Sequence, residues 1–416
     1  MATRMEQIIA VLVIIAIIMS ASTLYYGFTI FGELSRLTPP TLTVVGPWSG
    51  AEMDAFLPIL ARFEAVSGIN VKYRVLRAED LSTLLPAQFA AGTAPGDIIF
   101  MWAWWTGEQA QAGHILDVTG LVDTADFLPG TYDQITVDGK IYGGAYTGKV
   151  KPGFWYRKSF FAANNLTATN ENSTWAEFAT LLAGIKAVPG IVDPIVSGDS
   201  VGWPLTDITE HFLITFGGPQ LQRDLISGAA DWTTNPTRGI FANYLAPTLG
   251  NFSAPLAWDS TAVTSWWQGD YGLYFMGSWI TGMVENATDL GIIPLPGCDA
   301  LVLPADYFFI PKYTKYTAQA QELFSFLISE EAQRLQTAQG GHIATNINVP
   351  QSAYPEVDLM IVNFTKRFAI LPDLDDTIGG EFQTTLWQQL RTLWVTDPVT
   401  PQALDNILAA IQAQAP

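Results

Sequence analysis

The chain has 416 residues, a length that suits two or three domains with substantial hydrophobic cores. Hydrophobic residues make up 49% of it and charged residues only 14%, which excludes a disordered chain. The net charge of −19 excludes nucleic acids and anionic lipid surfaces as partners. The chain has one cysteine and three histidines, which excludes a disulfide framework, a cysteine-based zinc site and an iron–sulfur cluster. Neither a metal nor a cofactor is therefore expected.

The first 33 residues contain a long apolar segment without charged residues, from Ile8 to Phe31. As a helix it would be about 36 Å long, enough to cross a hydrocarbon core of ~30 Å. Residues 1–33 are therefore expected to form an N-terminal signal or anchor helix, followed by a linker at 34–40. Small residues at 20–22 would suit cleavage of a signal peptide, but the length of the apolar run favours a retained transmembrane anchor. Either form places the rest of the chain outside the cytoplasm.

Beyond the linker, short β-branched segments alternate with amphipathic segments. This pattern predicts strands and helices in alternation, with strands at residues 41–47, 70–76 and 97–101 and helices at 52–66 and 81–91. Such alternation indicates a mainly parallel sheet covered by helices, and ligands of these sheets bind at the carboxyl ends of the strands. Trp48 and Trp102 stand at two of these ends, and Trp104 and Trp105 follow.

Further segments have the order and spacing of one known family. An opening strand and helix at 41–48 and 55–71 precede a third strand and its helix at 96–102 and 110–117. Second-lobe segments follow at 153–161, 272–279 and 290–296, and a C-terminal helix at 382–394. Together they resemble the extracellular solute-binding proteins of ABC importers, in particular the maltose and sugar-binding members (family 1).

The resemblance implies an α/β, two-lobed, periplasmic-binding-protein-like fold of type II with discontinuous lobes. Lobe one is then expected to comprise residues 41–149 and 303–347. Lobe two is expected to comprise residues 150–302 and 348–416. The chain should cross between the lobes near residues 149–151, 297–303 and 345–350.

The resemblance also implies a cell-surface substrate-binding protein and not an enzyme. An oligosaccharide, maltodextrin-like or similar, would be captured between the lobes by hinge closure and passed to the membrane subunits of an ABC importer. The alternatives are an oligopeptide-binding receptor and a glycosylated surface-layer or filament subunit. A glycoside hydrolase needs only two carboxylates, and the 39 acidic residues leave that possibility open.

Tryptophan rings stack on the C–H faces of sugars while carboxylates bind the hydroxyl groups, so a sugar site should combine both. Strand ends and the resemblance together indicate these candidate ligand-binding residues: Trp48, Trp102, Trp104, Trp203, Asp207, Trp279, Asp306 and Trp387. Sugar-binding relatives often have polar residues where this chain has Trp104 and Trp105, so the polar half of the site stays unassigned.

Other residues have competing interpretations. Glu210 either joins Asp207 in binding hydroxyl groups or lies on a solvated face, and Asp97 either caps backbone amides or orders the ligand loop. Four further tryptophans are expected in the core or on the surface: Trp175, Trp232, Trp258 and Trp394. Trp266 and Trp267 are left open.

Five N-x-Ser/Thr sequons predict glycosylation of an exported protein, at Asn165, Asn172, Asn251, Asn286 and Asn363. Chance occurrence in a Thr-rich chain is the alternative.

Two motif-like segments are not expected to bind ligands. Residues 143–149 have the spacing of a phosphate-binding loop, but Val150 replaces the hydroxyl that would hold magnesium, and Gly148 and Lys149 are expected at a lobe crossover. The acidic segment beginning at residue 373 resembles a calcium loop, but Thr384 stands where a bidentate glutamate is required. Cys298 is expected to be a small buried residue.

Overall fold

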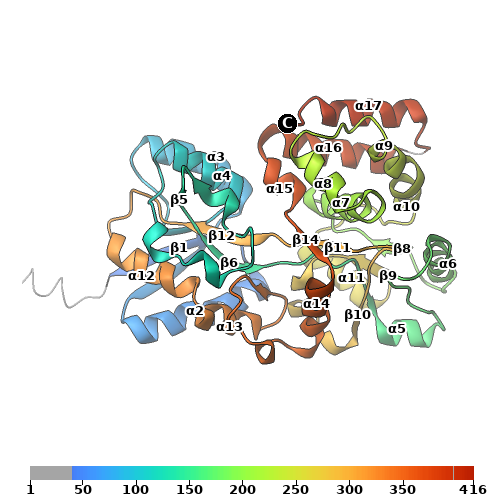
Figure 1. The fold of residues 1–416 in the computed structure, drawn as a ribbon. Coiled ribbons are helices and arrows are strands. Elements are labelled where there is room, and N and C mark those ends of the chain that lie inside the picture. The colour runs from blue at the N-terminus through green and yellow to red at the C-terminus, as the bar shows by residue number, and fades with distance from the viewer. Residues whose placement is uncertain (1–39, 397) are drawn as a thin grey trace, which may run out of the picture.

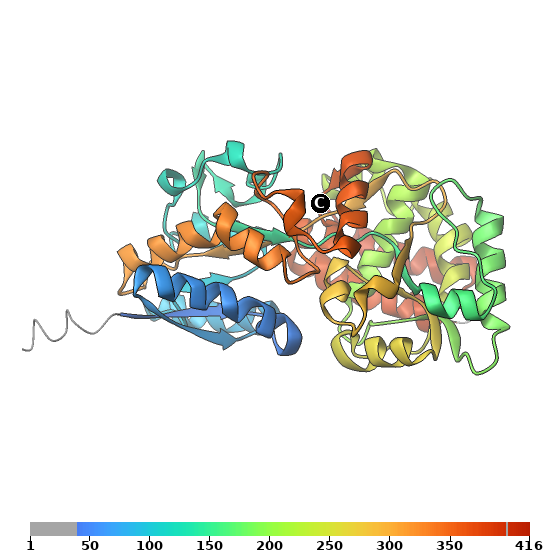
Figure 2. The same ribbon diagram turned by 90° about the horizontal axis from the view of Figure 1, so that it is seen from below.

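The computed structural model describes residues 40–396 and 398–416, which form two α/β lobes lying side by side (Figure 1). The view from below shows the same two bodies (Figure 2). The expected anchor helix at 1–33 and all of the linker except Pro40 lie outside the described residues. Within the described part of the chain, no helix combines the length and the apolar character needed to cross a bilayer.

Lobe one is built on a six-stranded sheet in the order β13-β6-β12-β3-β1-β2. Its strands are β1 (Thr41–Gly46), β2 (Asn70–Val75), β3 (Ile98–Phe100), β6 (Gly144–Gly148), β12 (Ala305–Phe309) and β13 (Ile343–Ala344). β1 pairs in parallel with β2 and β3, as predicted, whereas β12 runs antiparallel to β3 and β6. The direction of β12 is reversed because the chain re-enters the sheet from lobe two, at the end where β6 leaves it.

Helices cover both faces of this sheet: α2 (Gly50–Ser67), α3 (Ala78–Ala90), α4 (Ala103–Gln111), α12 (Thr317–Leu327) and α13 (Glu330–Thr337). Helices α2, α12 and α13 pack on the face that carries Val44, and α3 and α4 pack on the face that carries Val45. Helix α2 buries four residues at helical spacing: Phe56, Ile59, Leu60 and Phe63. It ends where Gly68 adopts a left-handed conformation with φ of 71°.

Lobe two contains a four-stranded sheet in the order β10-β7-β9-β8. Its strands are β7 (Phe154–Arg157), β8 (Asp193–Val196), β9 (Tyr271–Phe275) and β10 (Leu290–Ile293). Before the chain returns to lobe one, it forms these helices: α5 (Lys158–Ala163), α6 (Trp175–Lys186), α7 (Trp203–Gly217), α8 (Pro219–Ile226), α9 (Thr237–Ile240), α10 (Ala246–Leu249) and α11 (Val263–Gln268). The C-terminal helices are α14 (Glu356–Arg367), α15 (Leu374–Ile378), α16 (Gly380–Val395) and α17 (Pro401–Gln412).

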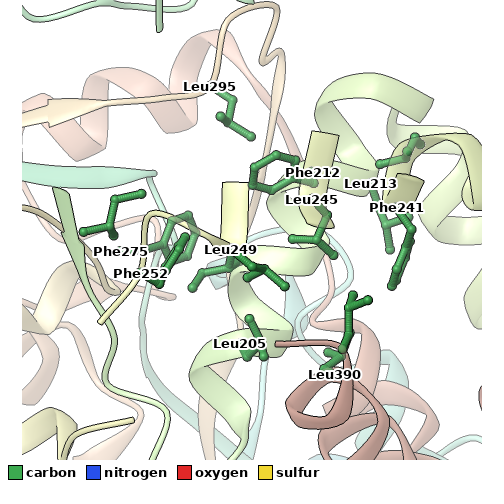
Figure 3. Close-up of a cluster of buried hydrophobic side chains, with 14 of the residues drawn as sticks. Leu205, Phe212, Leu213, Phe241, Leu245, Leu249, Phe252, Phe275, Leu295 and Leu390 are labelled. Atoms are coloured by element: carbon green, nitrogen blue, oxygen red, sulfur yellow. The ribbon is translucent and has the colours of Figure 1, made fainter. Parts of the chain in front are cut away.

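The hydrophobic core of lobe two joins helices that are far apart in sequence. Figure 3 shows Leu205 and Phe212 of α7 in the same cluster as Leu249 of α10 and Leu390 of α16. Helix α17 contributes further buried residues, including Ile407. The C-terminal helices are therefore part of the core of this lobe.

The chain passes between the lobes in neighbouring extended segments. After β6, residues 149–151 lead into lobe two, and they lie beside the segment that returns to β12. The backbone amide of Lys149 donates to the carbonyl oxygen of Pro304 (2.9 Å), and that of Lys151 donates to Val302 (2.9 Å). On the lobe-two side, β11 (Ala300–Val302) pairs in parallel with β14 (Ala369–Leu371). The sheet of lobe one thus draws its strands from residues 41–148 and 305–344.

Candidate ligand-binding site

A cavity of about 880 Å³ lies between the lobes, and both lobes and the crossover segments line it. On the lobe-one side it is bounded by the segments that follow β1 and β3, with Trp48 and Trp102. On the lobe-two side, the start of α7, the segment after β9 and helix α16 contribute Trp203, Trp279 and Trp387. Its volume falls within the range of roughly 300–1,000 Å³ that is typical of small-molecule sites.

Six tryptophans line this cavity: Trp48, Trp102, Trp203, Trp258, Trp279 and Trp387. Five of them are candidates named from the sequence. Trp258 was expected in the core or on the surface, but it begins a short helical turn at residues 258–262 that brings its ring to the cavity wall.

Three of these rings pack against one another in edge-to-face and tilted arrangements on the lobe-two wall. The ring centroid of Trp203 lies 5.4 Å from that of Trp258 and 5.7 Å from that of Trp279, with interplanar angles of 68° and 59°. Trp258 and Trp279 are 6.2 Å apart at 83°. This packing holds the rings in fixed orientations and presents an apolar surface to the cavity.

Trp104 lies behind Trp102 and does not line the cavity, contrary to the expectation from the sequence. The two rings stack with centroids 5.8 Å apart and an interplanar angle of 15°. The indole of Trp104 packs against Gly379 of lobe two, where an added Cβ would come within 2.4 Å of the ring. Nearby, Gln134 of lobe one donates to Thr377 Oγ1 of lobe two (2.9 Å). Trp104 therefore joins the two lobes at the rim of the cavity.

Lys149 organises the charged groups on the lobe-one side. Its Nζ lies 3.1 Å from Glu52 Oε1 and 3.9 Å from Asp306 Oδ1, and it also lies 5.8 Å from the ring centroid of Trp48 and 5.3 Å from that of Trp279. Burial raises the pKa of Asp306 to about 6, although the charge of Lys149 opposes this shift.

Lys151 has the same role on the lobe-two side. Its buried ammonium group contacts the carboxylates of Asp207 and Asp373, the latter at 3.1 Å. Burial raises the pKa of Asp207 to about 7, against the effect of Lys151. The indole Nε1 of Trp387 donates to Asp375 Oδ2 (2.6 Å), and burial, followed by the charge of Asp373, raises the pKa of Asp375 well above its usual value.

Two overlapping groups of carboxylates in the described residues are close enough to share a metal ion: Asp207, Glu210 and Asp373, and Asp373, Asp375 and Asp376. The ammonium group of Lys151 already lies between Asp207 and Asp373, and Trp387 binds Asp375. A cation and an indole N–H group of the protein thus already bind one or more carboxylates of each group, while Asp207 Oδ2 and Glu210 Oε1 have no partner among the described residues.

Four buried polar atoms of cavity-lining residues have no hydrogen-bond partner among the described residues: Trp48 Nε1, Trp279 Nε1, Asp207 Oδ2 and Asp306 Oδ2. Buried polar groups are almost always paired. The two indoles need an acceptor and the two carboxylates need a donor. A ligand that brings both kinds of group would satisfy all four.

Asp97 and Glu210 lie outside the cavity lining and have structural partners. Asp97 Oδ2 accepts from the amide of Thr43 (2.8 Å), and its Oδ1 accepts from the hydroxyl of Thr314 (2.5 Å). Glu210 Oε2 accepts from Gln222 Nε2 (2.8 Å) and from the amide of Leu374 (3.0 Å).

The remaining aromatic candidates and Cys298 contribute to packing. Trp232 is fully buried in the core of lobe two, and Trp175 and Trp394 pack against the same cluster, as expected. Trp266 is also fully buried, whereas Trp267 is half-buried. Cys298 is buried, its thiol donates to the carbonyl oxygen of Ala300 (3.1 Å), and burial raises its pKa to about 11.

Several residues that line the cavity are not among the candidates predicted from the sequence: Glu52, Lys151, Trp258, Asp373 and Asp375. The acidic residues at 373–376 are a visible signal, but their pattern in the sequence resembles only a calcium loop. Lys151 lies in the segment 149–151, which is expected at a lobe crossover and has no predicted role in binding. No pattern within the sequence indicates that these segments meet in space.

All five sequons lie outside the six-stranded sheet of lobe one and its helices. Asn165, Asn172, Asn286 and Asn363 are exposed. Asn251 is half-buried, and its side-chain amide donates to the carbonyl oxygen of Thr248 (3.3 Å).

Two α/β lobes, extended crossovers and a cavity between the lobes define the class of two-lobed solute receptors. Residues 47–334 match the family of bacterial extracellular solute-binding proteins, and the chain belongs to this family. Its members are the extracellular receptors of ABC transporters, and they are not enzymes. The resemblance noted in the sequence is thereby confirmed.

An uncharacterised ABC transporter extracellular-binding protein of Pyrococcus horikoshii is 47% identical over 380 residues, covering 90% of this chain and 88% of that protein. Among solved structures, a bacterial solute receptor with a substrate preference for β-D-galactopyranose has a TM-score of 0.80 at 15% identity, covering 90% of this chain and 98% of its own. A chitin oligosaccharide binding protein has a TM-score of 0.73 at 22% identity, with coverage of 90% and 98%. At these identities, the structural likeness establishes the fold alone.

Proposed function

We propose that this protein captures an oligosaccharide between its lobes and presents it to the membrane subunits of an ABC importer. The observation that carries the proposal is the composition of the cavity wall, where six tryptophans lie among carboxylates. The indole N–H groups of Trp48 and Trp279 have no partner among the described residues. Tryptophan faces pack against the C–H faces of sugar rings, and the polar groups bind hydroxyl groups. Both features line the same cavity.

The comparisons support a sugar as the ligand. Solved structures with the same fold include receptors described with galactopyranose, with chitin oligosaccharides and, in a Thermotoga maritima protein, with maltose. The volume of about 880 Å³ is large enough for more than one pyranose ring.

The mechanism that we propose is hinge closure. Lobe one (41–149 and 303–347) and lobe two (150–302 and 348–416) would move as bodies about the crossover segments, and the closed form would be recognised by the importer. No covalent bond is made or broken. A micromolar dissociation constant corresponds to about −8 kcal/mol, which a few stacked rings and several hydrogen bonds can supply.

We also propose that residues 8–31 are retained as a membrane anchor and that the sequons carry glycans. The apolar character of that segment and the exposure of four of the sequon asparagines support this proposal. N-terminal sequencing of the native protein tests the anchor, because a mature chain that begins near Ser22 or Thr23 would show a cleaved signal peptide. Intact mass before and after enzymatic or chemical deglycosylation tests the glycans.

Calorimetry with a panel of oligosaccharides and oligopeptides tests the main proposal. We expect at least one di- or trisaccharide to bind with a micromolar or lower dissociation constant, and we expect no oligopeptide to bind. Binding of oligopeptides without any sugar would replace the substrate class while leaving the transport role. Cleavage of an oligosaccharide during incubation would contradict the assignment as a receptor.

A further inference from the structure

Acidic groups outnumber basic groups on the cavity wall by nine to three. The carboxylates are Glu52, Glu79, Asp133, Asp207, Asp259, Asp306, Asp373, Asp375 and Asp376. The basic residues are Arg77, Lys149 and Lys151, and each of them is already in an ion pair with a carboxylate of this set. These three cations are shared among five of the nine carboxylates, and Glu79, Asp133, Asp375 and Asp376 have no ion pair among the described residues. The wall therefore carries more acidic than basic groups.

Two of these carboxylates, one in each lobe, have an oxygen without any partner among the described residues. Asp207 in α7 is 3% exposed, and its Oδ2 receives no hydrogen bond, while its other oxygen binds Lys151. Asp306 in β12 likewise has an unpaired Oδ2. An unpaired carboxylate oxygen that has lost its hydration is costly, so each of these atoms calls for a donor from the ligand.

The residues around Asp207 favour a donor that carries positive charge. Trp203 lies four residues before Asp207 in α7, so the two side chains occupy the same face of the helix. Trp203 packs in one cluster with Trp258 and Trp279, and the faces of tryptophan rings attract cations. The lysines already use this property, since Lys151 Nζ lies 5.9 Å from the ring centroid of Trp203.

The unpaired indole groups of Trp48 and Trp279 require acceptors such as hydroxyl oxygens, which a simple inorganic cation does not supply. We infer that the ligand is an amino-sugar oligosaccharide whose protonated amines bind Asp207 and Asp306 and whose hydroxyl oxygens accept from these indoles. The inference rests on the proposed function as a sugar receptor and names the chemical class of the sugar.

The protonation behaviour of the two carboxyl groups agrees with this ligand. Burial raises the pKa of Asp207 to about 7 and that of Asp306 to about 6, so each carboxylate is disfavoured as an anion before a ligand arrives. An ammonium group placed against them favours the charged form again. A neutral sugar would supply hydroxyl donors but no positive charge.

Calorimetry with three oligomers of equal ring number and the same β-1,4 linkage tests the inference: glucosamine, N-acetylglucosamine and glucose oligomers. They differ at the second ring carbon, which carries an amine, an acetamide or a hydroxyl group. We expect the glucosamine oligomer to bind at least tenfold more tightly than either neutral oligomer at pH 6.5–7. The difference should shrink as sodium chloride is raised, because salt screens the charge interaction.

Two variants locate the amine. Asp207→Asn and, independently, Asp306→Asn should each weaken binding of the glucosamine oligomer at least tenfold and change the binding of a neutral oligomer less than threefold. Asp306 lies in the other lobe and does not contact Lys151, so it keeps the test valid if Asp207→Asn disturbs the fold. Asp405→Asn, on the exposed side of α17, makes the same change in net charge outside the cavity and should leave binding unchanged.

Equal or tighter binding of a neutral oligomer overturns the inference and leaves the sugar receptor intact. Binding of some other neutral sugar from the wider panel, with no binding of the glucosamine oligomer, has the same consequence. Binding of oligopeptides alone contradicts the proposed function itself.

Discussion

Lys149 and Lys151 compensate acidic groups on opposite walls of the same cavity. Lys149 pairs with Glu52 in lobe one, and Lys151 pairs with Asp207 and Asp373 in lobe two. Burial alone would lower the pKa of Lys151, but the carboxylates beside it outweigh that effect and keep it protonated. Two residues of the crossover thus determine the electrostatic state of the site.

Lys151→Met should destabilise the protein strongly, because it leaves Asp207 and Asp373 buried without their cation. Removing one partner of a buried pair costs about 3–5 kcal/mol, and uptake of protons by the carboxyl groups will reduce the loss. Urea unfolding at pH 7 measures it. Lys140→Met removes an exposed lysine that pairs with Asp117 (3.1 Å) and should have no measurable effect. Equal losses in both variants would contradict the role assigned to Lys151.

Trp279→Ala should weaken binding of the preferred sugar by about 1–3 kcal/mol, as expected when a buried aromatic anchor is lost. The ring is 6% exposed and packs over Gly277, so some loss of stability will accompany this change. Trp232→Ala is the matched control, because Trp232 is fully buried in the core of lobe two and does not line the cavity. It should lower stability by about 3–5 kcal/mol and leave the affinity of the folded protein unchanged. Calorimetry below the unfolding temperature separates the two effects.

At the scale of elements, the sequence predicts the opening of lobe one well. Helix α2 is detected from the spacing of its buried residues, and β2 is detected from its alternation. The helix is detected because its periodicity reflects local burial, whereas the alternation in β2 is between half-buried and exposed side chains. The reversed direction of β12 depends on a return from another lobe, and the position of Trp258 depends on a turn at residues 258–262. Neither leaves a periodic signal.

Helix α7 begins next to the buried carboxyl group of Asp199, and this group makes the stability of the protein depend on pH. Asp199 Oδ1 accepts from the amide of Leu205 (3.2 Å), and burial raises the pKa of Asp199 to about 7. In the unfolded chain the group titrates near 3.9, so between these values the folded state binds more protons. The contribution of Asp199 to the free energy of unfolding is therefore largest at acidic pH and is lost as pH rises through about 7.

Asp199→Asn should remove this dependence. We expect the difference in the free energy of unfolding, variant minus wild type, to be about 2–3 kcal/mol more positive at pH 8 than at pH 5. This follows because one pKa unit corresponds to about 1.4 kcal/mol. Urea titrations at the two pH values measure the difference. An unchanged offset would show that Asp199 does not stay protonated in the folded state.

At the scale of the whole molecule, three contacts between side chains or backbone of the two lobes lie near the cavity. Trp104 meets Gly379, Gln134 meets Thr377, and Arg77 pairs with Asp259 (3.5 Å). These residues are far apart in sequence and belong to different lobes. The meeting of Trp104 with Gly379 could not be predicted, because it exists only when the lobes are close together.

Gly379→Ala should hinder closure, because its Cβ would come within 2.4 Å of the Trp104 ring. We expect ligand affinity to fall at least tenfold and small-angle X-ray scattering to show a larger radius of gyration in the presence of sugar. Gly380→Ala is the control: its φ of 56° is also in the left-handed region, like the 69° of Gly379, but an added Cβ meets nothing within 4 Å. It should bind within about threefold of the wild type. Equal effects would assign the loss to backbone strain.

The C-terminal helices contribute to the core of lobe two, and this has a consequence for how the protein folds during its synthesis. Leu390 of α16 and Ile407 of α17 are buried against residues that precede them by well over a hundred positions. Lobe one in turn requires β12, which is synthesised after most of lobe two. Neither lobe can complete its core before late segments of the chain have emerged, and contacts of such long sequence separation form slowly. A chain that is exported during synthesis would therefore cross the membrane before it folds, and it would complete both cores on the outside.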